Sequence, residues 1–210
     1  MIYGMDRNQY SAMKYQPTSL RDRRGFTLIE LMVVIVILGI LMSITFPAIN
    51  KVMFNAQKTR CKADAVQLKN SITSYYTDYL KYPVKDAGGS DKQVLSDDNI
   101  MGALLASDKE GQAEGLNPRK ISFYSAKAAK PAGSGRYSGG VHFSGDGGGS
   151  LWDPWGNNFS IILDTDYNNR VNVPGWEKRF TEVGENVIVW SPGRDREEAQ
   201  VTDNIMTWEN

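Results

Sequence analysis

Apolar and polar residues divide the N-terminal part of the chain into three successive zones. Residues 1–25 are mainly polar and slightly basic, and residues 26–46 are apolar at nearly every position. The polar exceptions in this second zone are Thr27, Glu30, Ser43 and Thr45. A helix rises about 1.5 Å per residue, so the zone reaches about 30 Å, the thickness of a bilayer's hydrocarbon core. The pattern predicts a transmembrane helix over residues 26–47.

The third zone has the pattern of an amphipathic helix. From Ala48 onward, apolar residues recur every three or four positions, which places them on one helical face. This stripe consists of Cys61, Ala65, Leu68, Ile72, Tyr75 and Tyr79. We predict one helix from Phe26 to about Leu80, in which residues 48–83 form a stem that packs on a globular domain. Pro83 is expected to end it, because proline cannot continue a helix.

Two residues inside the predicted helix disfavour helical geometry. Gly39 costs about 1 kcal/mol relative to alanine, and Pro47 costs about 3 kcal/mol because it lacks an N–H group. Membrane-spanning helices tolerate both residues, so an ordinary kink is one interpretation. A functional helix break at Gly39 and Pro47 is the other.

Residues 84–210 are long enough to form one small globular domain. Short β-branched runs bounded by turn residues predict strands at 158–163, 170–173 and 187–190. A short helix is expected within 99–107, and the glycine-rich and serine-rich segment 133–149 predicts a flexible surface loop. We therefore expect an α+β fold, in which the second half of the long helix packs on a small antiparallel sheet of three or four strands.

Composition argues against two broad classes of function. The formal net charge is zero and no basic patch stands out, which argues against nucleic acid as a partner. The single histidine, His142, and the single cysteine, Cys61, offer little for a catalytic pair, so we do not expect an enzyme. The five tryptophans could form a sugar-stacking face, but their positions near turns and strand ends favour packing.

The carboxylate of Glu30 stands at the start of the apolar run. An ionised side chain at membrane depth costs roughly 2.5–3.5 kcal/mol or more, so it indicates a partner and a function. The surrounding stretch, residues 23–31, reads Arg-Arg-Gly-Phe-Thr-Leu-Ile-Glu-Leu. It resembles the class III signal of type IV prepilins and of the pseudopilins of type II secretion systems. A cleaved secretory signal and a plain single-span anchor are the alternatives, although the run is longer than the apolar region of a usual signal peptide.

The resemblance implies processing and assembly at the membrane. A prepilin peptidase would cut between Gly25 and Phe26 and methylate the new amine, so residues 1–25 would be a cleaved leader peptide. In the assembled filament, Glu30 of one subunit would neutralise the Phe26 amine of its neighbour. This pairing would set the axial register of the filament, because the net stability gained from burying two opposite charges is small.

The family also implies a location and a set of partners. The protein would cross the bacterial inner membrane once, with its C-terminal domain in the periplasm. It would contact copies of itself, other pilin-like subunits and an inner-membrane assembly platform. The helix between Gly39 and Pro47 would unwind in the filament and lengthen the stem.

A second motif lies in the C-terminal domain, where residues 153–157 read Asp-Pro-Trp-Gly-Asn. Asp-Pro begins a turn and glycine permits a positive φ, so we expect a corner with Trp155 buried beneath it and a strand directly after it. The motif resembles a signature of the major pseudopilins, although Asn158 stands where the family usually has proline.

The segment from Trp190 to Trp208 resembles the calcium loop of the major pseudopilins. The resemblance implies carboxylate ligands from Asp195 and Asp203 and a carbonyl ligand from Pro192, and oxygen donors alone suit Ca²⁺. Arg196 replaces a glycine of the family, and a metal-free loop closed by hydrogen bonds is the alternative. A further acidic run at 164–168 begins like an EF-hand loop but lacks its later glycine and glutamate, so we expect a hairpin turn there.

These features predict a structural subunit. The first hypothesis is a pseudopilin that polymerises into a periplasmic fibre for type II protein secretion. The alternative is a type IV pilin of a surface filament for adhesion, motility or DNA uptake, but many such pilins carry a disulfide that Cys61 alone cannot form. A membrane-tethered binding module is a third possibility from a different class.

Overall fold

The structure, a computed structural model, describes residues 25–85, 88–107, 115–145 and 148–209, without the side chains of residues 44, 45, 47 and 48. All of the predicted leader peptide except Gly25 lies outside the described residues. The chain divides into two compact units, Met1–Pro47 and Ala48–Asn210.

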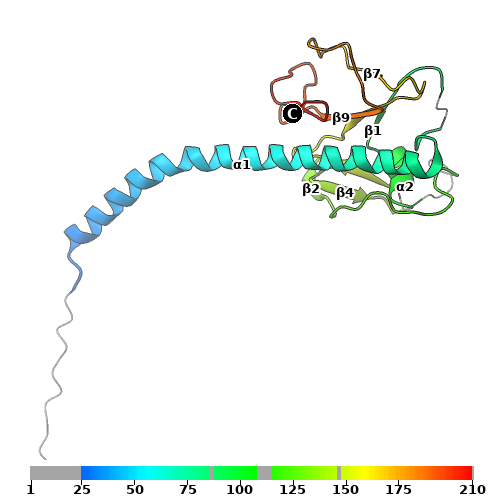
Figure 1. The fold of residues 1–210 in the computed structure, drawn as a ribbon. Coiled ribbons are helices and arrows are strands. Elements are labelled where there is room, and N and C mark those ends of the chain that lie inside the picture. The colour runs from blue at the N-terminus through cyan, green and yellow to red at the C-terminus, as the bar shows by residue number, and fades with distance from the viewer. Residues whose placement is uncertain (1–24, 86–87, 108–114, 146–147, 210) are drawn as a thin grey trace, which may run out of the picture. The chain divides into compact units, whose positions relative to one another are not determined.

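A single long helix, α1 (Leu28–Tyr79), forms the N-terminal part of the described chain (Figure 1). It ends at Tyr79, four residues before Pro83, because the next residue, Leu80, adopts a left-handed φ of 54° that stops the helical repeat. The helix continues through Gly39 and Pro47, so their proposed role as break points stays a prediction. Among the described residues, no helix is both long enough and apolar enough to cross a membrane, so the predicted span is not confirmed.

The second unit contains a four-stranded antiparallel sheet in the order β1-β6-β9-β10. Its strands are β1 (Lys92–Leu95), β6 (Ser160–Leu163), β9 (Val187–Ser191) and β10 (Ile205–Met206). The predictions for 158–163 and 187–190 are confirmed by β6 and β9. The third predicted strand is shorter, because β7 (Val171–Asn172) pairs only with β8 (Glu182–Val183), outside the main sheet. The predicted short helix is α2 (Asp98–Leu104).

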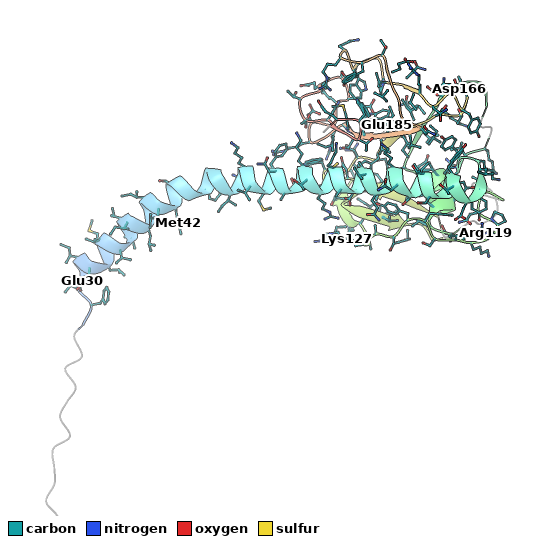
Figure 2. All side chains as sticks on the ribbon, in the orientation of Figure 1. Glu30, Met42, Arg119, Lys127, Asp166 and Glu185 are labelled. Atoms are coloured by element: carbon teal, nitrogen blue, oxygen red, sulfur yellow. The ribbon has the colours of Figure 1, made fainter. Side chains whose placement is uncertain are left out.

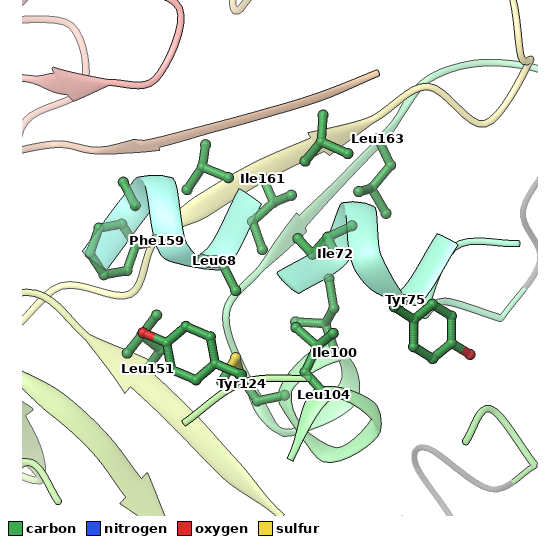
Figure 3. Close-up of a cluster of buried hydrophobic side chains, with 14 of the residues drawn as sticks. Leu68, Ile72, Tyr75, Ile100, Leu104, Tyr124, Leu151, Phe159, Ile161 and Leu163 are labelled. Carbon is green, nitrogen blue, oxygen red and sulfur yellow. The ribbon is translucent and has the colours of Figure 1, made fainter. Parts of the chain in front are cut away.

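The main sheet is covered on both faces, since its central strands β6 and β9 are buried at every position. Alternate residues of a strand point to opposite faces. Ile161 and Leu163 pack with Leu68 and Ile72 of α1, as Figure 3 shows, whereas Ile162 belongs to a second cluster. That second cluster also contains Val171, Ile188, Trp190 and Met206. The predicted α+β fold, with a stem helix on a small antiparallel sheet, is therefore confirmed in its architecture.

The glycine-rich segment 133–149 differs from the predicted flexible loop. It contributes to two hairpins, built from β2 (Lys130–Gly133), β3 (Arg136–Ser138), β4 (Gly140–Phe143) and β5 (Gly149–Trp152). The physical reason is that glycines serve here as turn residues. Gly133, Gly135 and Gly139 have positive φ values, which glycine adopts without steric cost, and the buried Val141 anchors β4 in the core.

Candidate functional site

The first turn of α1 carries a reciprocal pair of hydrogen bonds between Thr27 and Glu30. The backbone N–H of Thr27 and its hydroxyl each donate to Oε2 of Glu30 at 2.8 Å. The N–H of Glu30 points back to the Thr27 hydroxyl oxygen at 3.3 Å, and the Thr27 carbonyl accepts the first helical bond from Leu31. This arrangement is a capping box, which satisfies N–H groups that every helix N-terminus leaves open. Figure 2 shows Glu30 at this end of the helix.

The residues around the capping box are open to contact. Phe26 is 78% exposed, and a Cβ atom built on Gly25 would meet nothing within 4 Å. Large apolar side chains are exposed along the following turns, including Leu28, Ile29 and Leu31 through Leu38. Exposed apolar surface on this scale marks a site of association with protein or lipid. The predicted processing residues therefore lie next to an uncovered apolar segment of α1, whose one carboxylate is that of Glu30.

A second constellation surrounds Asp153, at the Asp-Pro-Trp-Gly-Asn corner. Its buried carboxylate accepts backbone hydrogen bonds at 2.8 Å from the N–H groups of Trp155 and Asn157. The side-chain amide of Asn157 adds a third bond at 2.8 Å. Gly156 adopts a φ of +88°, as the turn requires. The buried residue of the corner is therefore Asp153, whereas Trp155, predicted to be buried, is only half-buried because it packs at the edge of the core against Phe54.

The same carboxylate ties the corner to the C-terminal loop. The Ser191 hydroxyl donates to Asp153 at 2.6 Å, and the Asn157 amide donates to the carbonyl of Gly193 at 2.8 Å. Gly193 has a φ of +76°, and a Cβ atom there would lie 2.4 Å from the carbonyl oxygen of Asp203. Only glycine fits this position, so the corner and the C-terminal loop are fixed against each other.

The surroundings of Asp153 are unfavourable for charge. Burial raises the pKa of Asp153, and the hydrogen bonds from Asn157 and Ser191 act in the opposite direction. Burial also raises the pKa of the Cys61 thiol, with a further contribution from the nearby Asp153. Cys61 is therefore a protonated core residue, consistent with its place on the apolar stripe.

The predicted calcium ligands lie in a loop that is closed by its own backbone. Oδ2 of Asp203 accepts hydrogen bonds from the N–H groups of Arg194 and Asp195, at 2.7 and 3.0 Å. Oδ1 of Asp195 accepts from the N–H of Glu197 at 2.9 Å. Both carboxylates are thus engaged in holding the loop, and Pro192 is buried directly before its glycine turn.

This donor set fits Ca²⁺ only in part. The two carboxylates and the nearby carbonyl groups are oxygen donors of the right kind. Against this, two N–H donors already converge on Oδ2 of Asp203, and Arg194 and Arg196 flank Asp195. Within the described part of the chain, the group of three acidic side chains close enough to share a metal ion lies elsewhere.

The sequence patterns indicate Glu30 and the corner but not two of their hydrogen-bond partners. Thr27 is half of the capping box, and the spacing Thr-x-x-Glu before an apolar run is a recognised signal for that motif. Ser191 joins the corner to the C-terminal loop across 38 positions of sequence. No local sequence pattern predicts a contact between residues so far apart in the chain.

Comparison with known proteins identifies the N-terminal region. The family model of the prokaryotic N-terminal methylation motif matches residues 20–46. The type II secretion system core protein G of Dickeya chrysanthemi is 41% identical over 68 residues, which cover 32% of this chain and 44% of that protein. The corresponding protein of Escherichia coli is 41% identical over 66 residues, covering 31% and 46%. A fimbrial protein of Neisseria meningitidis is 34% identical over 85 residues, covering 40% and 48%.

The N-terminal region is therefore type IV prepilin-like, which confirms the resemblance seen in the sequence. Among the matched relatives, the type II secretion system core proteins G reach 41% identity over 66–69 residues. The chain spans about half the length of the curated relatives it matches. No solved structure matches it significantly.

Proposed function

We propose that this protein is a pseudopilin subunit that polymerises into a periplasmic fibre for type II protein secretion. The observation that carries the proposal is the carboxylate of Glu30, held in a capping box at the start of an exposed apolar helix. A helix with this surface is incomplete alone, because its apolar side chains need other helices or lipid around them. The methylation motif over residues 20–46 supports the same conclusion.

Processing is the first step of the proposed function. A prepilin peptidase cuts the bond between Gly25 and Phe26, and the new amine on Phe26 is methylated. The lack of a side chain at Gly25 and the exposure of Phe26 support access by a membrane peptidase. Before cleavage this amine is an amide nitrogen, so the cation that matches Glu30 arises only when the leader is removed.

Assembly is the second step. Residues 26–47 anchor the subunit in the inner membrane, with residues 48–210 on the periplasmic side. An assembly platform brings subunits together, and Glu30 of one subunit pairs with the Phe26 amine of the next. Pairing removes two isolated charges from an apolar layer and fixes one axial offset between neighbours. Gly39 and Pro47 act in this proposal as helix breaks, between which the helix unwinds and lengthens the stem in the filament.

A type IV pilin remains the closest alternative, but the matches do not favour it. Relatives named as type II secretion core proteins reach 41% identity, whereas the fimbrial relative reaches 34%. A membrane-tethered binding module lacks support of its own, since Trp176, Trp190 and Trp208 pack against one another instead of forming an open face.

Complementation in two hosts distinguishes a role in type II secretion from a role in a type IV pilus. The chain is expressed in a strain that lacks its type II core protein G, and in another that lacks its major type IV pilin. We expect export of a secreted enzyme to return in the first strain and no surface filaments in the second. Filaments without export would contradict the proposal and favour the pilin.

Calcium binding by Asp195, Asp203 and the Pro192 carbonyl is a separate proposal. When bound, Ca²⁺ would supply charge neutralisation for the two carboxylates and hold the C-terminal loop closed. The hydrogen bonds from Arg194 and Asp195 to Asp203 support closure of the loop without an ion. Removal of Ca²⁺ tests whether the ion or the hydrogen bonds hold the loop closed.

A further inference from the structure

Three aspartates meet at one end of the main sheet, although they come from two separate segments of the chain. Asp91 directly precedes β1, and Asp164 directly follows β6. Since Lys92 pairs with Leu163 at the end of this antiparallel ladder, Asp91 and Asp164 are opposite each other just beyond it. Asp166 lies two residues further on, and one carboxylate oxygen from each lies within 4.8 Å of the others. Figure 2 labels Asp166 on the globular domain.

One buried oxygen atom of this aspartate group has no hydrogen-bond partner. Asp164 is only 1% exposed. Oδ2 of Asp91 accepts hydrogen bonds from the backbone and side chain of Asn172, at 2.9 and 3.0 Å. Oδ1 of Asp91 is fully buried and has no hydrogen-bond partner. A buried carboxylate oxygen without a donor costs free energy, so it indicates a missing ligand independently of the clustering of charge.

The side chains that reach the three carboxylates are neutral amides, such as that of Asn168, which donates to Oδ2 of Asp166 at 2.9 Å. No ion pair within the described residues joins any of them to lysine or arginine. Like charges directly opposite in a sheet are destabilising, and close carboxylates cannot all ionise without a proton or a cation between them.

We propose that Asp91, Asp164 and Asp166 bind a Ca²⁺ ion at the joined ends of β1 and β6. The backbone N–H groups of Asn168 and Asn169 hold the two oxygens of Asp164 at 3.1 and 2.9 Å, which orients this carboxylate. The remaining donors are oxygens on an irregular turn, which suits the flexible shell of Ca²⁺ better than the strict octahedron of Mg²⁺. Asp91, which directly precedes β1, supplies the distant acidic ligand that the turn after β6 lacks.

The site is separate from the proposed C-terminal loop site, so the test isolates it. The full chain is purified in detergent with Asp195→Asn and Asp203→Asn, freed of metal, and titrated with Ca²⁺ alone. We expect a saturable rise in the melting temperature, and luminescence of bound Tb³⁺ sensitised by the nearby tyrosines Tyr82 and Tyr167. Adding Asp166→Asn, an exposed position, should weaken binding at least tenfold. Asp78→Asn, another exposed acid, serves as the matched control and should leave binding unchanged.

Two results would overturn the proposal. One is the absence of any Ca²⁺-dependent shift or Tb³⁺ signal in the Asp195→Asn, Asp203→Asn background. The other is equal affinity with and without Asp166→Asn, which would mean that the bound ion lies elsewhere. If the background variant does not fold, the Tb³⁺ titration is run on the wild-type chain and its Asp166→Asn variant. Loss of one binding equivalent then supports the site, and unchanged stoichiometry and affinity refute it.

Discussion

The hydroxyl of Ser191 donates a 2.6 Å hydrogen bond to the buried carboxylate of Asp153, joining the end of β9 to the Asp-Pro-Trp-Gly-Asn corner. The same carboxylate accepts bonds from the N–H groups of Trp155 and Asn157. Asp153→Ala removes all of these acceptors at once. Each buried donor left without a partner costs about 1–3 kcal/mol, so we expect a loss of about 2–5 kcal/mol in the free energy of unfolding. Urea denaturation followed by tryptophan fluorescence measures it.

The matched control for this experiment is Asp78→Asn. Asp78 is an exposed acid of α1 whose ion pair with Arg119 spans 3.5 Å at the surface. Such pairs contribute little, so the change should stay within about 0.5 kcal/mol. Equal stabilities of Asp153→Ala and Asp78→Asn would show that the corner does not depend on the buried carboxylate.

The capping box makes a prediction about Thr27. Thr27→Val keeps the shape of the side chain but removes the hydroxyl that bonds Glu30. Loss of a cap costs about 0.5–2 kcal/mol, which corresponds to about 2- to 30-fold faster amide exchange in the first turn of α1. Hydrogen exchange of the full chain in detergent measures this rate. Thr27→Ser retains the hydroxyl and should behave as wild type, whereas identical fast exchange in both variants would refute the role of the hydroxyl.

Glu177 predicts a specific acid dependence of stability. Its nearly fully buried carboxylate is bonded by the Arg179 guanidinium, which lowers the pKa of Glu177 to about 2, below its ordinary value of 4.5. A lowered pKa in the folded state stabilises the protein above pH 4.5, and this contribution is lost as the pH falls from there through about 2. The stability difference between wild type and Glu177→Gln should therefore shrink over this range. A difference that is the same at pH 6 and pH 2.5 would contradict the assignment.

Chelation tests the C-terminal loop separately from the cluster at Asp91. In an Asp166→Asn background, the calcium proposal predicts that a chelator lowers the melting temperature and that Asp203→Asn abolishes this shift. Asp203 also accepts two backbone hydrogen bonds, so Asp203→Asn should itself lower the stability. A melting temperature that is insensitive to chelator would leave Asp203 as a purely hydrogen-bonded closure of the loop.

Periodicity predicted the long helix, and β-branched runs bounded by turn residues predicted the central strands. The stripe from Cys61 to Tyr75 is fully buried, as its spacing indicated, because a helical face of apolar residues must be covered. The glycine-rich hairpins were not predicted, since glycine suits a tight turn and a flexible loop equally well in sequence. The two-residue strand β10 carries too short a pattern to be detected before its pairing with β9 is known.

The candidate sites also differ in whether their contacts are local or long-range in the sequence. Thr27 and Glu30 lie three residues apart, so a local sequence pattern is sufficient to predict their contact. Asp91 and Asp164 become neighbours only through the register of β1 and β6, and the acidic turn at Asp164 resembled an ordinary hairpin without Asp91. Side chains that meet through tertiary structure leave no local pattern.

Fibre assembly by Glu30 variants of the full chain, with a prepilin peptidase and a type II assembly system present, tests the proposed function of the N-terminal helix. Mass spectrometry first establishes that the mature chain begins at methylated Phe26, so that a defect in assembly is distinguished from a defect in processing. We predict that Glu30→Ala and Glu30→Gln are processed but form no fibres, because the Phe26 amine then has no counter-charge. Asp78→Asn should be processed and assemble normally. Normal fibres and protein export from processed Glu30→Ala would contradict the proposed pairing of Glu30 with the Phe26 amine.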